Sequence, residues 1–416
     1  MPYIARVIDG ELGARLASAG AVVIEGPKAC GKTTTARQRA ASEVLLDIDE
    51  AARQAATVDP SLVLEGPTPR LIDEWQVEPA LWNHIRRTVD RRKLPGQFIL
   101  SGSAVPSDDV TRHTGAGRIA RLRMRPMSLF ESGHSTNDIS LASILDGAPV
   151  RSPDPGLTLA DLATRIAVGG WPGFQEFSEA EALRAVSDYL DEIRRTDITR
   201  VDGTRRDPER VGRLLRALAR NSATAVAATK LAAEAGGADG PLDRETVRDY
   251  LVALERLMIV ENQPAWAPHL RSRSQARTAP TRHFVDPSLA VAALGASPER
   301  LLRDLNFLGF LHESLVIRDL RIYSQGIDGN VLHYRDNTGL EVDAIVETRE
   351  GRWAAFEIKL GGKLVDEGAA NLLRFASRVD SKRIGDPALL GVISGTGYGY
   401  IRGDGVAVIP IGALGA

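Results

Sequence analysis

The segment GPKACGKT at residues 26–33 constrains the fold of this chain more than any other feature. It fits the P-loop pattern G-x-x-x-x-G-K-[ST] without a mismatch, the strand-like AVVIE precedes it, and the helix-compatible TTARQRAAS follows. In such a loop, glycines let successive backbone N–H groups converge on phosphate oxygens at a helix N-terminus. We therefore predict that Lys32 reaches the β- and γ-phosphates of ATP and that the Thr33 hydroxyl ligates Mg²⁺.

A P-loop requires an acidic site at the end of a second strand, and PRLIDEW supplies one. Asp73 is predicted to hold the magnesium, and Glu74 to orient or deprotonate the attacking water. The next strand, QFILSGS, ends in Ser101 and Ser103, and a polar residue there can sense the γ-phosphate. Arg118 is a candidate arginine finger, acting within a subunit or on a neighbour; a solvated basic strand explains it equally well. The predicted nucleotide-binding residues are Gly26, Pro27, Lys28, Ala29, Cys30, Gly31, Lys32, Thr33, Thr34, Asp73 and Ser101.

Composition limits the class of protein. At 416 residues, the chain is long enough for two to four domains, and 43% hydrophobic with 25% charged residues is typical of a globular protein. The net charge of −2 gives no global basic excess that would argue for nucleic acid. A single cysteine excludes an intramolecular disulfide, and the seven histidines show no metal-ligand spacing, so zinc is not expected. The amino terminus does not read as a signal peptide and no apolar run approaches a membrane span, so we expect a cytoplasmic protein without membrane contact.

The pattern of elements divides the chain. From residue 22 to about residue 131, bare apolar runs alternate with helix-compatible segments, which predicts a parallel α/β sheet. Helical segments follow a Ser-, Asp-, Pro- and Gly-rich stretch at residues 133–158. From residue 211, short helices precede two strand-like runs that flank the basic HLRSRSQAR, the ingredients of a winged helix-turn-helix. The tail, from about residue 298, is α/β again.

DNA binding by the winged helix is one of two interpretations. The predicted recognition helix would present Arg244, Thr246, Arg248 and Asp249 to a groove, and the wing would bring arginines to phosphates. The wing arginines are Arg271, Arg273 and Arg277. Acidic residues on the helix favour the other interpretation, a module that packs domains together.

The order of the P-loop, LIDEWQ, FILSGS, GRIARLRMRPMSLFE and GGWP resembles a prokaryotic AAA-type ATPase family with a carboxy-terminal DUF4143 region. Trp75 replaces the aliphatic residue usual after Asp-Glu, and we expect it to pack against Trp82. The resemblance covers nearly the whole chain. It implies an AAA-type P-loop domain at 1–135, a linker and helical lid at 136–208, a winged helix-turn-helix at 209–292 and a PD-(D/E)xK nuclease-like α/β domain at 293–416.

The tail holds a second candidate site. Asp343 lies in the strand-like GLEVDAIVE, and Glu357 and Lys359 lie on one face of the next strand, WAAFEIKLG. A turn between the strands would bring Asp343 beside that pair, which resembles the PD-(D/E)xK nuclease core. Glu313 occupies the place of the helical acidic residue, so Glu313, Asp343 and Glu357 are candidate ligands of a second Mg²⁺, with Asp343, Glu357 and Lys359 as catalytic residues. Charges that merely line a solvated strand, or a nuclease fold kept for binding, remain alternatives.

Two functions follow from these sites. The first is a Mg²⁺-dependent ATPase whose cycle controls a DNA-facing tail that is a candidate nuclease. The second is a nucleotide-gated interaction switch whose non-catalytic tail binds a protein partner. An arginine finger acting in trans would require a homo-oligomer. Cys30 occupies a variable position of the loop, where the backbone matters more than the side chain, so we expect only a small residue there. The alternative is a reactive thiol at the helix N-terminus, which an alkylating reagent would label and ATP would protect.

Overall fold

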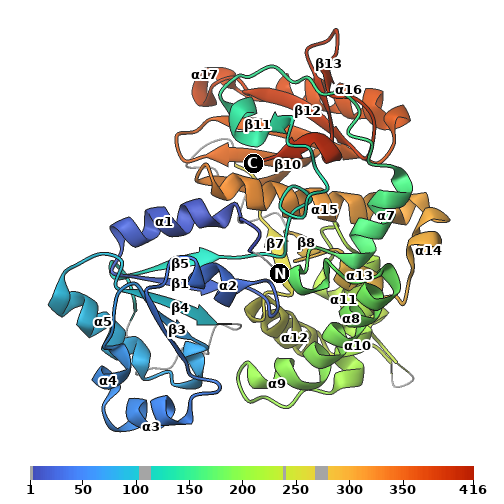
Figure 1. Ribbon diagram of the computed structural model, residues 1–416. Coiled ribbons are helices and arrows are strands. Elements are labelled where there is room, and N and C mark those ends of the chain that lie inside the picture. Colours follow the sequence, from blue (N-terminus) through green and yellow to red (C-terminus); the bar gives the residue numbers. More distant parts are fainter. Residues whose placement is uncertain (1–2, 103–113, 238–239, 268–279) are drawn as a thin grey trace.

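The computed structural model describes residues 3–102, 114–237, 240–267 and 280–416. Ser103 and the wing residues Arg271, Arg273 and Arg277 lie outside this part of the chain. Figure 1 shows an amino-terminal α/β unit in blue, a helical region in green and yellow, and a carboxy-terminal α/β unit in orange and red.

The amino-terminal unit is built on a five-stranded parallel sheet with the strand order β2-β3-β4-β1-β5. The strands are β1 (Ala21–Glu25), β2 (Ser42–Leu45), β3 (Arg70–Asp73), β4 (Phe98–Gly102) and β5 (Ile119–Arg123). The helices are α1 (Ile8–Ser18), α2 (Lys32–Arg37), α3 (Glu50–Val58), α4 (Pro60–Leu64), the short 3₁₀ helix η1 (Trp75–Val77) and α5 (Leu81–Arg92). This sheet confirms the predicted α/β fold of a P-loop domain.

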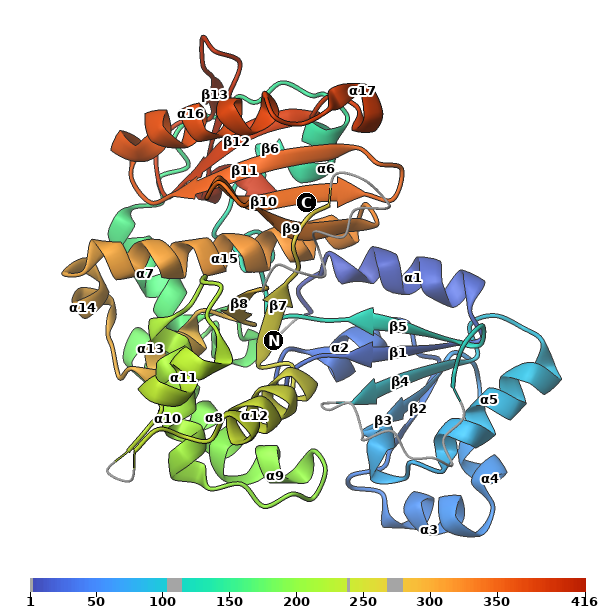
Figure 2. The same ribbon diagram turned by 180° about the vertical axis from the view of Figure 1, so that it is seen from behind.

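Both faces of this sheet are buried, as its bare apolar strands predict. Val22 and Ile24 of β1 pack with the apolar side of α1, whereas Val23 packs on the opposite face with α5. On that second face the rings of Trp75 and Trp82 lie 5.1 Å apart, which confirms their predicted contact. Figure 2 shows the carboxyl ends of β1, β4 and β5 pointing toward the helical region.

The stretch at residues 136–158 packs on the carboxy-terminal unit. It contains β6 (Ile139–Ser140) and α6 (Leu141–Leu145), and β6 pairs with β15 (Leu414–Gly415) at the far end of the chain. A backbone bridge between Ser152 and Gly399 fastens it further. The linker predicted from composition is therefore held by strand pairing to a unit that begins more than a hundred residues later.

The middle of the chain is helical. It contains α7 (Leu159–Val168), η2 (Pro172–Phe174), α8 (Glu179–Glu192), the π-helical turn η3 (Ile193–Asp197), α9 (Ile198–Arg200), α10 (Pro208–Arg220), α11 (Ala228–Glu234) and α12 (Arg244–Arg256). The antiparallel pair β7 (Val260–Gln263) and β8 (Thr281–Phe284) follows, and Thr224 bridges to Arg282 of β8. The helices and the hairpin occur in the predicted order; the winged helix-turn-helix stays a prediction.

The carboxy-terminal unit is a six-stranded mixed sheet with the order β13-β14-β12-β11-β10-β9. Its strands are β9 (Gly329–Arg335), β10 (Glu341–Thr348), β11 (Trp353–Lys359), β12 (Leu389–Ser394), β13 (Tyr400–Ile401) and β14 (Ala407–Pro410). Its helical segments, with those that lead into it, are α13 (Ser288–Ala293), α14 (Pro298–Leu302), α15 (Leu305–Gln325), η4 (Gly362–Leu364), α16 (Val365–Ala376), α17 (Ser381–Ile384) and η5 (Ile411–Ala413).

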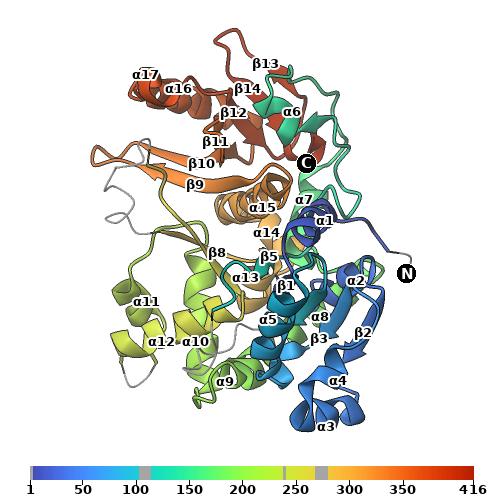
Figure 3. The same ribbon diagram turned by 90° about the vertical axis from the view of Figure 1, so that its left-hand side faces the viewer.

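The long helix α15 joins the regions. Its apolar side packs on the inner face of the carboxy-terminal sheet and on the middle helices within one continuous core, whereas α16 covers the outer face. Figure 3 shows α1 lying beside α15, between the two α/β units. None of the helices in the described ranges is long and apolar enough to cross a membrane.

Candidate nucleotide site and carboxy-terminal site

The P-loop leaves the carboxyl end of β1 in a conformation that requires glycine. A Cβ added at Gly26 would lie 2.4 Å from the Met124 carbonyl oxygen, which is closer than any real contact. Gly31 has φ of 102°, in the region that favours glycine, and Ala29 is left-handed as well with φ of 60°. The loop therefore folds back on itself between the strand and α2, as the motif predicts.

Lys32 is the first residue of α2, and its side chain turns into the loop. Its Nζ donates hydrogen bonds to the carbonyl oxygens of Gly26 (3.0 Å) and Pro27 (2.8 Å), and the residue is buried with 6% exposure. Among the described residues, no carboxylate lies within ion-pair distance of this ammonium group. A buried cation that is held only by neutral carbonyls suits an anionic ligand such as a phosphate.

Thr33, Asp73 and Ser101 meet at the carboxyl ends of neighbouring strands. Asp73 of β3 is in register with Ser101 of β4, and the Thr33 Oγ1 lies 3.1 Å from each carboxylate oxygen of Asp73. The Ser101 hydroxyl also donates to Asp73. A carboxylate with two hydroxyl groups is an oxygen donor set that fits Mg²⁺, and Thr33 and Asp73 are the residues that would hold it.

Glu74 lies directly after β3, with its backbone in the left-handed region at φ of 50°. A non-glycine residue in this backbone region is strained, and such strain recurs at functional sites. The Gln76 side-chain amide donates to the Glu74 carboxylate. Burial raises the pKa of Glu74, and the nearby Lys32 partly offsets that rise. A half-buried carboxylate with a raised pKa is suited to accept a proton.

Arg118 does not lie at the nucleotide loop of its own chain. It immediately precedes β5, and Ile119 is in register with Ala21, the first residue of β1. Because β1 and β5 are parallel, Arg118 lies at the edge of the sheet opposite the P-loop, where it pairs with Asp90 at 2.8 Å. The expectation of an arginine finger acting within the subunit is therefore wrong for this arrangement; a finger acting on a neighbour stays a prediction.

The loop also contacts residues that sequence reasoning missed. Lys28 Nζ lies 2.5 Å from Asp197 Oδ1, and the Tyr189 hydroxyl donates to the Lys28 carbonyl at 3.3 Å. Arg6 donates to the Cys30 carbonyl at 3.1 Å and pairs with Glu131 at 3.0 Å. Asp197 is buried in a π-helical turn, and such turns recur at functional sites. No contiguous motif marks these contacts, because their partners come from distant segments.

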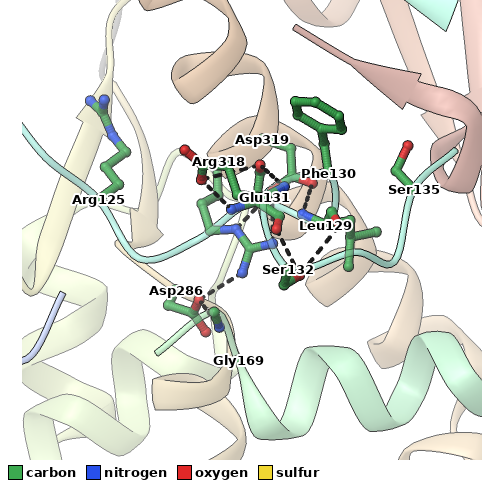
Figure 4. Close-up of polar contacts among 12 residues, drawn as sticks. Arg125, Leu129, Phe130, Glu131, Ser132, Ser135, Gly169, Asp286, Arg318 and Asp319 are labelled. Atoms are coloured by element: carbon green, nitrogen blue, oxygen red, sulfur yellow. Dashed lines mark hydrogen bonds and ion pairs between the residues drawn. The ribbon is translucent and has the colours of Figure 1, made fainter. Parts of the chain in front are cut away.

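A buried polar network begins at Leu129, in the same turn as Glu131, and continues into the rest of the molecule (Figure 4). The Leu129 amide donates to Asp319 of α15 at 3.0 Å. Arg318, also on α15, pairs with Asp319 at 2.7 Å and with Asp286 at 2.7 Å. The Asp286 carboxylate in turn accepts the Gly170 amide at 3.0 Å, within the GGWP segment. The segment that follows the parallel sheet, the helix α15 and the GGWP turn are thus joined by contiguous hydrogen bonds.

The carboxy-terminal site is set by strand register. β10 and β11 are antiparallel with Ala344 opposite Phe356, which places Asp343 beside the Glu357-x-Lys359 segment as predicted. Lys359 Nζ lies 2.7 Å from Glu357 Oε2 and 3.7 Å from Asp343 Oδ2. The Ile358 amide donates to Asp343 at 2.8 Å, and Asn371 of α16 donates to Glu357 at 2.7 Å.

Burial dominates the electrostatics of this site. It raises the pKa of Glu313, of Asp343 and of Glu357, the last to about 7. Burial alone would lower the pKa of Lys359, but Asp343 and Glu357 outweigh it and raise that pKa. The site is therefore rich in carboxylates that one ammonium group only partly neutralises.

The three acidic residues do not converge on one point. A cavity of about 830 Å³ is lined by Glu313, Asp343 and Lys359, whereas Glu357 faces a separate hollow that Asp343 and Lys359 also line. In the described part of the chain, no group of three His, Cys, Asp or Glu residues is placed so that it could hold a metal ion. We therefore derive no metal-dependent step at this site, and the second Mg²⁺ stays a prediction.

Two other expectations change with the structure. Asp249 of α12 does not face a free groove, because Arg206 holds it with hydrogen bonds of 2.8 and 2.9 Å. The Arg248 side chain pairs with Glu245 on the same helix at 3.0 Å. Cys30 is fully buried in the core beneath the loop, which contradicts a thiol accessible to alkylating reagents.

Comparisons with known proteins agree with the architecture. Residues 18–132 match an AAA domain family, residues 159–300 a domain of unknown function (DUF8612), and residues 308–414 a domain of unknown function (DUF4143). Uncharacterized proteins of Mycobacterium bovis and Mycobacterium tuberculosis are each 26% identical over 343 residues, which are 81% of this chain and 70% of theirs. A solved Walker-type ATPase of Pyrococcus abyssi is 12% identical with a TM-score of 0.44, covering 70% of this chain and 96% of its own. The chain is therefore a P-loop protein with an AAA domain on its amino-terminal side and a DUF4143 domain on its carboxy-terminal side.

Proposed function

We propose that the protein is a Mg²⁺-dependent ATPase whose nucleotide cycle controls its carboxy-terminal domain. The observation that carries the ATPase proposal is the buried Lys32 ammonium at the start of α2, whose hydrogen bonds to described residues all go to loop carbonyls. Entry of a phosphate would replace these neutral acceptors with an anionic one, and the attraction between opposite charges is strong in a buried site.

The roles of the other side chains follow from their positions. Thr33 and Asp73 would hold Mg²⁺, which neutralises phosphate charge when it is bound. Ser101, already hydrogen-bonded to Asp73, would keep that carboxylate oriented. Glu74, with its raised pKa, would take the proton of the attacking water. To accept that proton, the Glu74 carboxylate would either break its hydrogen bond with the Gln76 side-chain amide or accept the proton while that bond is kept.

Contacts of the loop support a link between the nucleotide and the carboxy-terminal domain. Lys28 contacts Asp197, and Arg6 joins the Cys30 carbonyl to Glu131. Glu131 lies in the same turn as Leu129, whose amide donates to Asp319 of the Asp319–Arg318–Asp286 network. A phosphate near Lys28 would compete with Asp197 for its charge. The helix α15, which bears Arg318, also carries Glu313. Such a chain of contacts is a physical route for coupling, and the coupling energy itself must be measured.

For the carboxy-terminal domain, we propose that it faces DNA. Asp343, Glu357 and Lys359 would cleave the DNA strand. The helix, three antiparallel strands, helix and parallel strand that surround these residues agree with the PD-(D/E)xK resemblance. The cavity beside Asp343 and Lys359 is large enough to accept part of a nucleotide chain.

The second candidate is a nucleotide-gated switch whose carboxy-terminal domain binds a protein partner without catalysis. It is favoured by the ion pairs of Lys359, which tie up both Glu357 and Asp343, and by the separation of Glu313 from Glu357. A lysine so paired stabilises a sheet edge and needs no reaction to explain it.

ATP turnover tests the first proposal. Lys32→Ala should reduce ATP binding and phosphate release with Mg²⁺ by about a hundredfold or more, since it removes the charge at the phosphates. Arg383→Ala is the matched control, because Arg383 is an exposed cation with one ion pair on α17. If Lys32→Ala neither lowers nucleotide affinity nor stops turnover, the ATPase proposal is wrong.

DNA cleavage separates the two candidate functions. Asp343→Ala and Lys359→Ala should each abolish any cutting of duplex or single-stranded DNA in Mg²⁺ or Mn²⁺, while ATP turnover without DNA persists. If the wild-type protein cuts no DNA and ATP instead changes its association with a protein partner at low salt, where phosphate contacts are strongest, the switch is supported.

A further inference from the structure

A cleft lined with arginines lies where the parallel sheet, β7 and α15 meet. Its volume is about 430 Å³, and five arginines and three carboxyl side chains line it. The arginines are Arg15, Arg121, Arg123, Arg125 and Arg321. Arg121, Arg123 and Arg125 come from the basic GRIARLRMRP stretch, to which neither the ATPase site nor the DUF4143 site assigns a role.

Glu261 of β7 is the centre of this cleft. Its carboxylate is 4% exposed, and Arg123 (2.9 Å), Arg125 (3.0 Å) and Arg321 (2.8 Å) all contact it. Three guanidinium groups offer about fifteen N–H donors, whereas one carboxylate offers about four acceptor sites. The cluster therefore carries excess positive charge and more donors than its single carboxylate can satisfy.

The charge imbalance shifts the pKa values of the residues in the cluster. Burial lowers the pKa of Arg321 to about 10, and Arg125 and Arg123 add to that effect by repulsion. Burial alone would raise the pKa of Glu261, but the three guanidinium groups outweigh it and lower that pKa. A guanidinium whose pKa falls despite a carboxylate at 2.8 Å is in surroundings that a further anion would stabilise.

Arg123 is the residue best placed to receive such an anion. It is 43% exposed, and it approaches Glu261 Oε1 through Nε, although that oxygen accepts no hydrogen bond. Its contact is therefore electrostatic and weakly directional, so the guanidinium fork can turn toward a ligand without breaking a hydrogen bond. Arg125 donates a hydrogen bond from its own Nε to Glu261. Figure 4 shows Arg125 apart from the Arg318 network.

We propose that this cleft binds a phosphate group, carried either by a small nucleotide-like ligand or by the backbone of a nucleic-acid strand. Arginine is the side chain best matched to phosphate, because its planar fork donates two parallel hydrogen bonds. The site lies at the junction of the AAA and DUF4143 domains, so a bound phosphate would contact β5 and α15 together. The proposal does not depend on ATP hydrolysis at the P-loop.

The test uses the full chain with Lys32→Ala, so that the P-loop does not contribute phosphate binding. Calorimetric titration with inorganic pyrophosphate and with a short single-stranded oligothymidylate, at low and at moderate salt, reads the two sources of phosphate separately. Adding Arg123→Gln should weaken the binding of whichever probe binds by about tenfold. It should also lower the magnitude of the slope of log K against log salt concentration by about one. Arg383→Gln is the control and should change neither quantity.

A second variant works in the opposite direction. Glu261→Gln removes the competing carboxylate and should tighten phosphate binding, with a larger rise in melting temperature on adding pyrophosphate. A merely structural Glu261 would not produce this gain. Should Glu261→Gln fail to fold, Arg123→Gln and Arg125→Gln decide together. The proposal is overturned if neither probe binds the Lys32→Ala protein, or if Arg123→Gln and Arg125→Gln bind both probes as that protein does.

Discussion

The two α/β units of this chain differ in how their sites and their surroundings are built. The nucleotide site comes from one contiguous loop and the ends of two adjacent strands, and its sheet has cores of its own. The carboxy-terminal site needs a helix and two strands, and its sheet shares one continuous core with the middle helices. The first unit meets the others largely through ion pairs and hydrogen bonds, such as Lys28–Asp197 and Arg125–Glu261.

This difference has a physical consequence. Close-packed apolar cores resist small displacements, whereas a polar junction can exchange partners at lower cost. We therefore expect the middle helices and the carboxy-terminal sheet to move together, and the P-loop unit to change its contacts with them when a nucleotide binds.

The largest effect should separate the chemistry of the two sites. Glu74→Gln should lower kcat for ATP hydrolysis by about a hundredfold or more and leave ATP affinity nearly unchanged, because it removes the base and keeps the shape. Asp343→Asn should change kcat by less than about twofold, measured as steady-state phosphate release without DNA. A comparable loss in both variants would contradict two separate sites.

The next effect concerns the buried junction. Arg318→Met should destabilise the protein by about 3–5 kcal/mol in urea unfolding, because it leaves Asp286 and Asp319 buried without their cation. The exposed pair of Arg383 and Asp380 provides the control, and Arg383→Met should cost less than about 0.5 kcal/mol. A small cost for Arg318→Met would show that the junction is not held by these charges.

A pH effect should distinguish the arginine cluster from ordinary surface pairs. The folded pKa of Glu261 lies below its usual 4.5, so its stabilising contribution is complete above that pH and is lost as the pH falls through the folded value. The difference in unfolding free energy between wild type and Glu261→Gln should therefore shrink as the pH falls from about 5 to about 3. A difference that stays constant over that range would contradict the charge cluster.

The smallest effect should be at Cys30. Because its thiol is fully buried, an alkylating reagent should label the folded protein only slowly, with or without ATP, and rapidly after denaturation. Cys30→Ala should leave kcat within about twofold, since the backbone and not the side chain of this position faces the phosphate. Rapid labelling of the native protein would show that the loop opens far more than its packing suggests.

Prediction from sequence succeeded where function depends on neighbouring residues. The backbone of residues 26–33 is fixed by glycines within the motif, and Asp73 follows an apolar strand that had to be buried in the same sheet. Alternation along WAAFEIKL placed Glu357 and Lys359 on one face, and a short turn left Asp343 little choice of neighbour. Local rules suffice in these places because glycine conformation, strand alternation and the burial of apolar strands are properties of short segments.

Other features could not be read in this way. The sequence made Arg118 a candidate arginine finger, but the parallel register of β1 and β5 places it at the edge of the sheet opposite the P-loop. The pairs Lys28–Asp197 and Leu129–Asp319 join residues more than a hundred and fifty positions apart. Burial also argues against the alternative of a reactive thiol at Cys30, because the position of this residue in the motif does not tell what packs on its side chain.

By itself, therefore, the sequence determined a P-loop domain, an acidic strand end and a second charged segment in the tail, because glycine conformations and strand alternation are local properties of a chain. The tertiary structure alone decided which charges meet. It put Glu313 and Glu357 in separate hollows and gathered three arginines around Glu261. Such encounters depend on how whole sheets and helices pack, and the energy of a buried charge is set by the partners that this packing supplies.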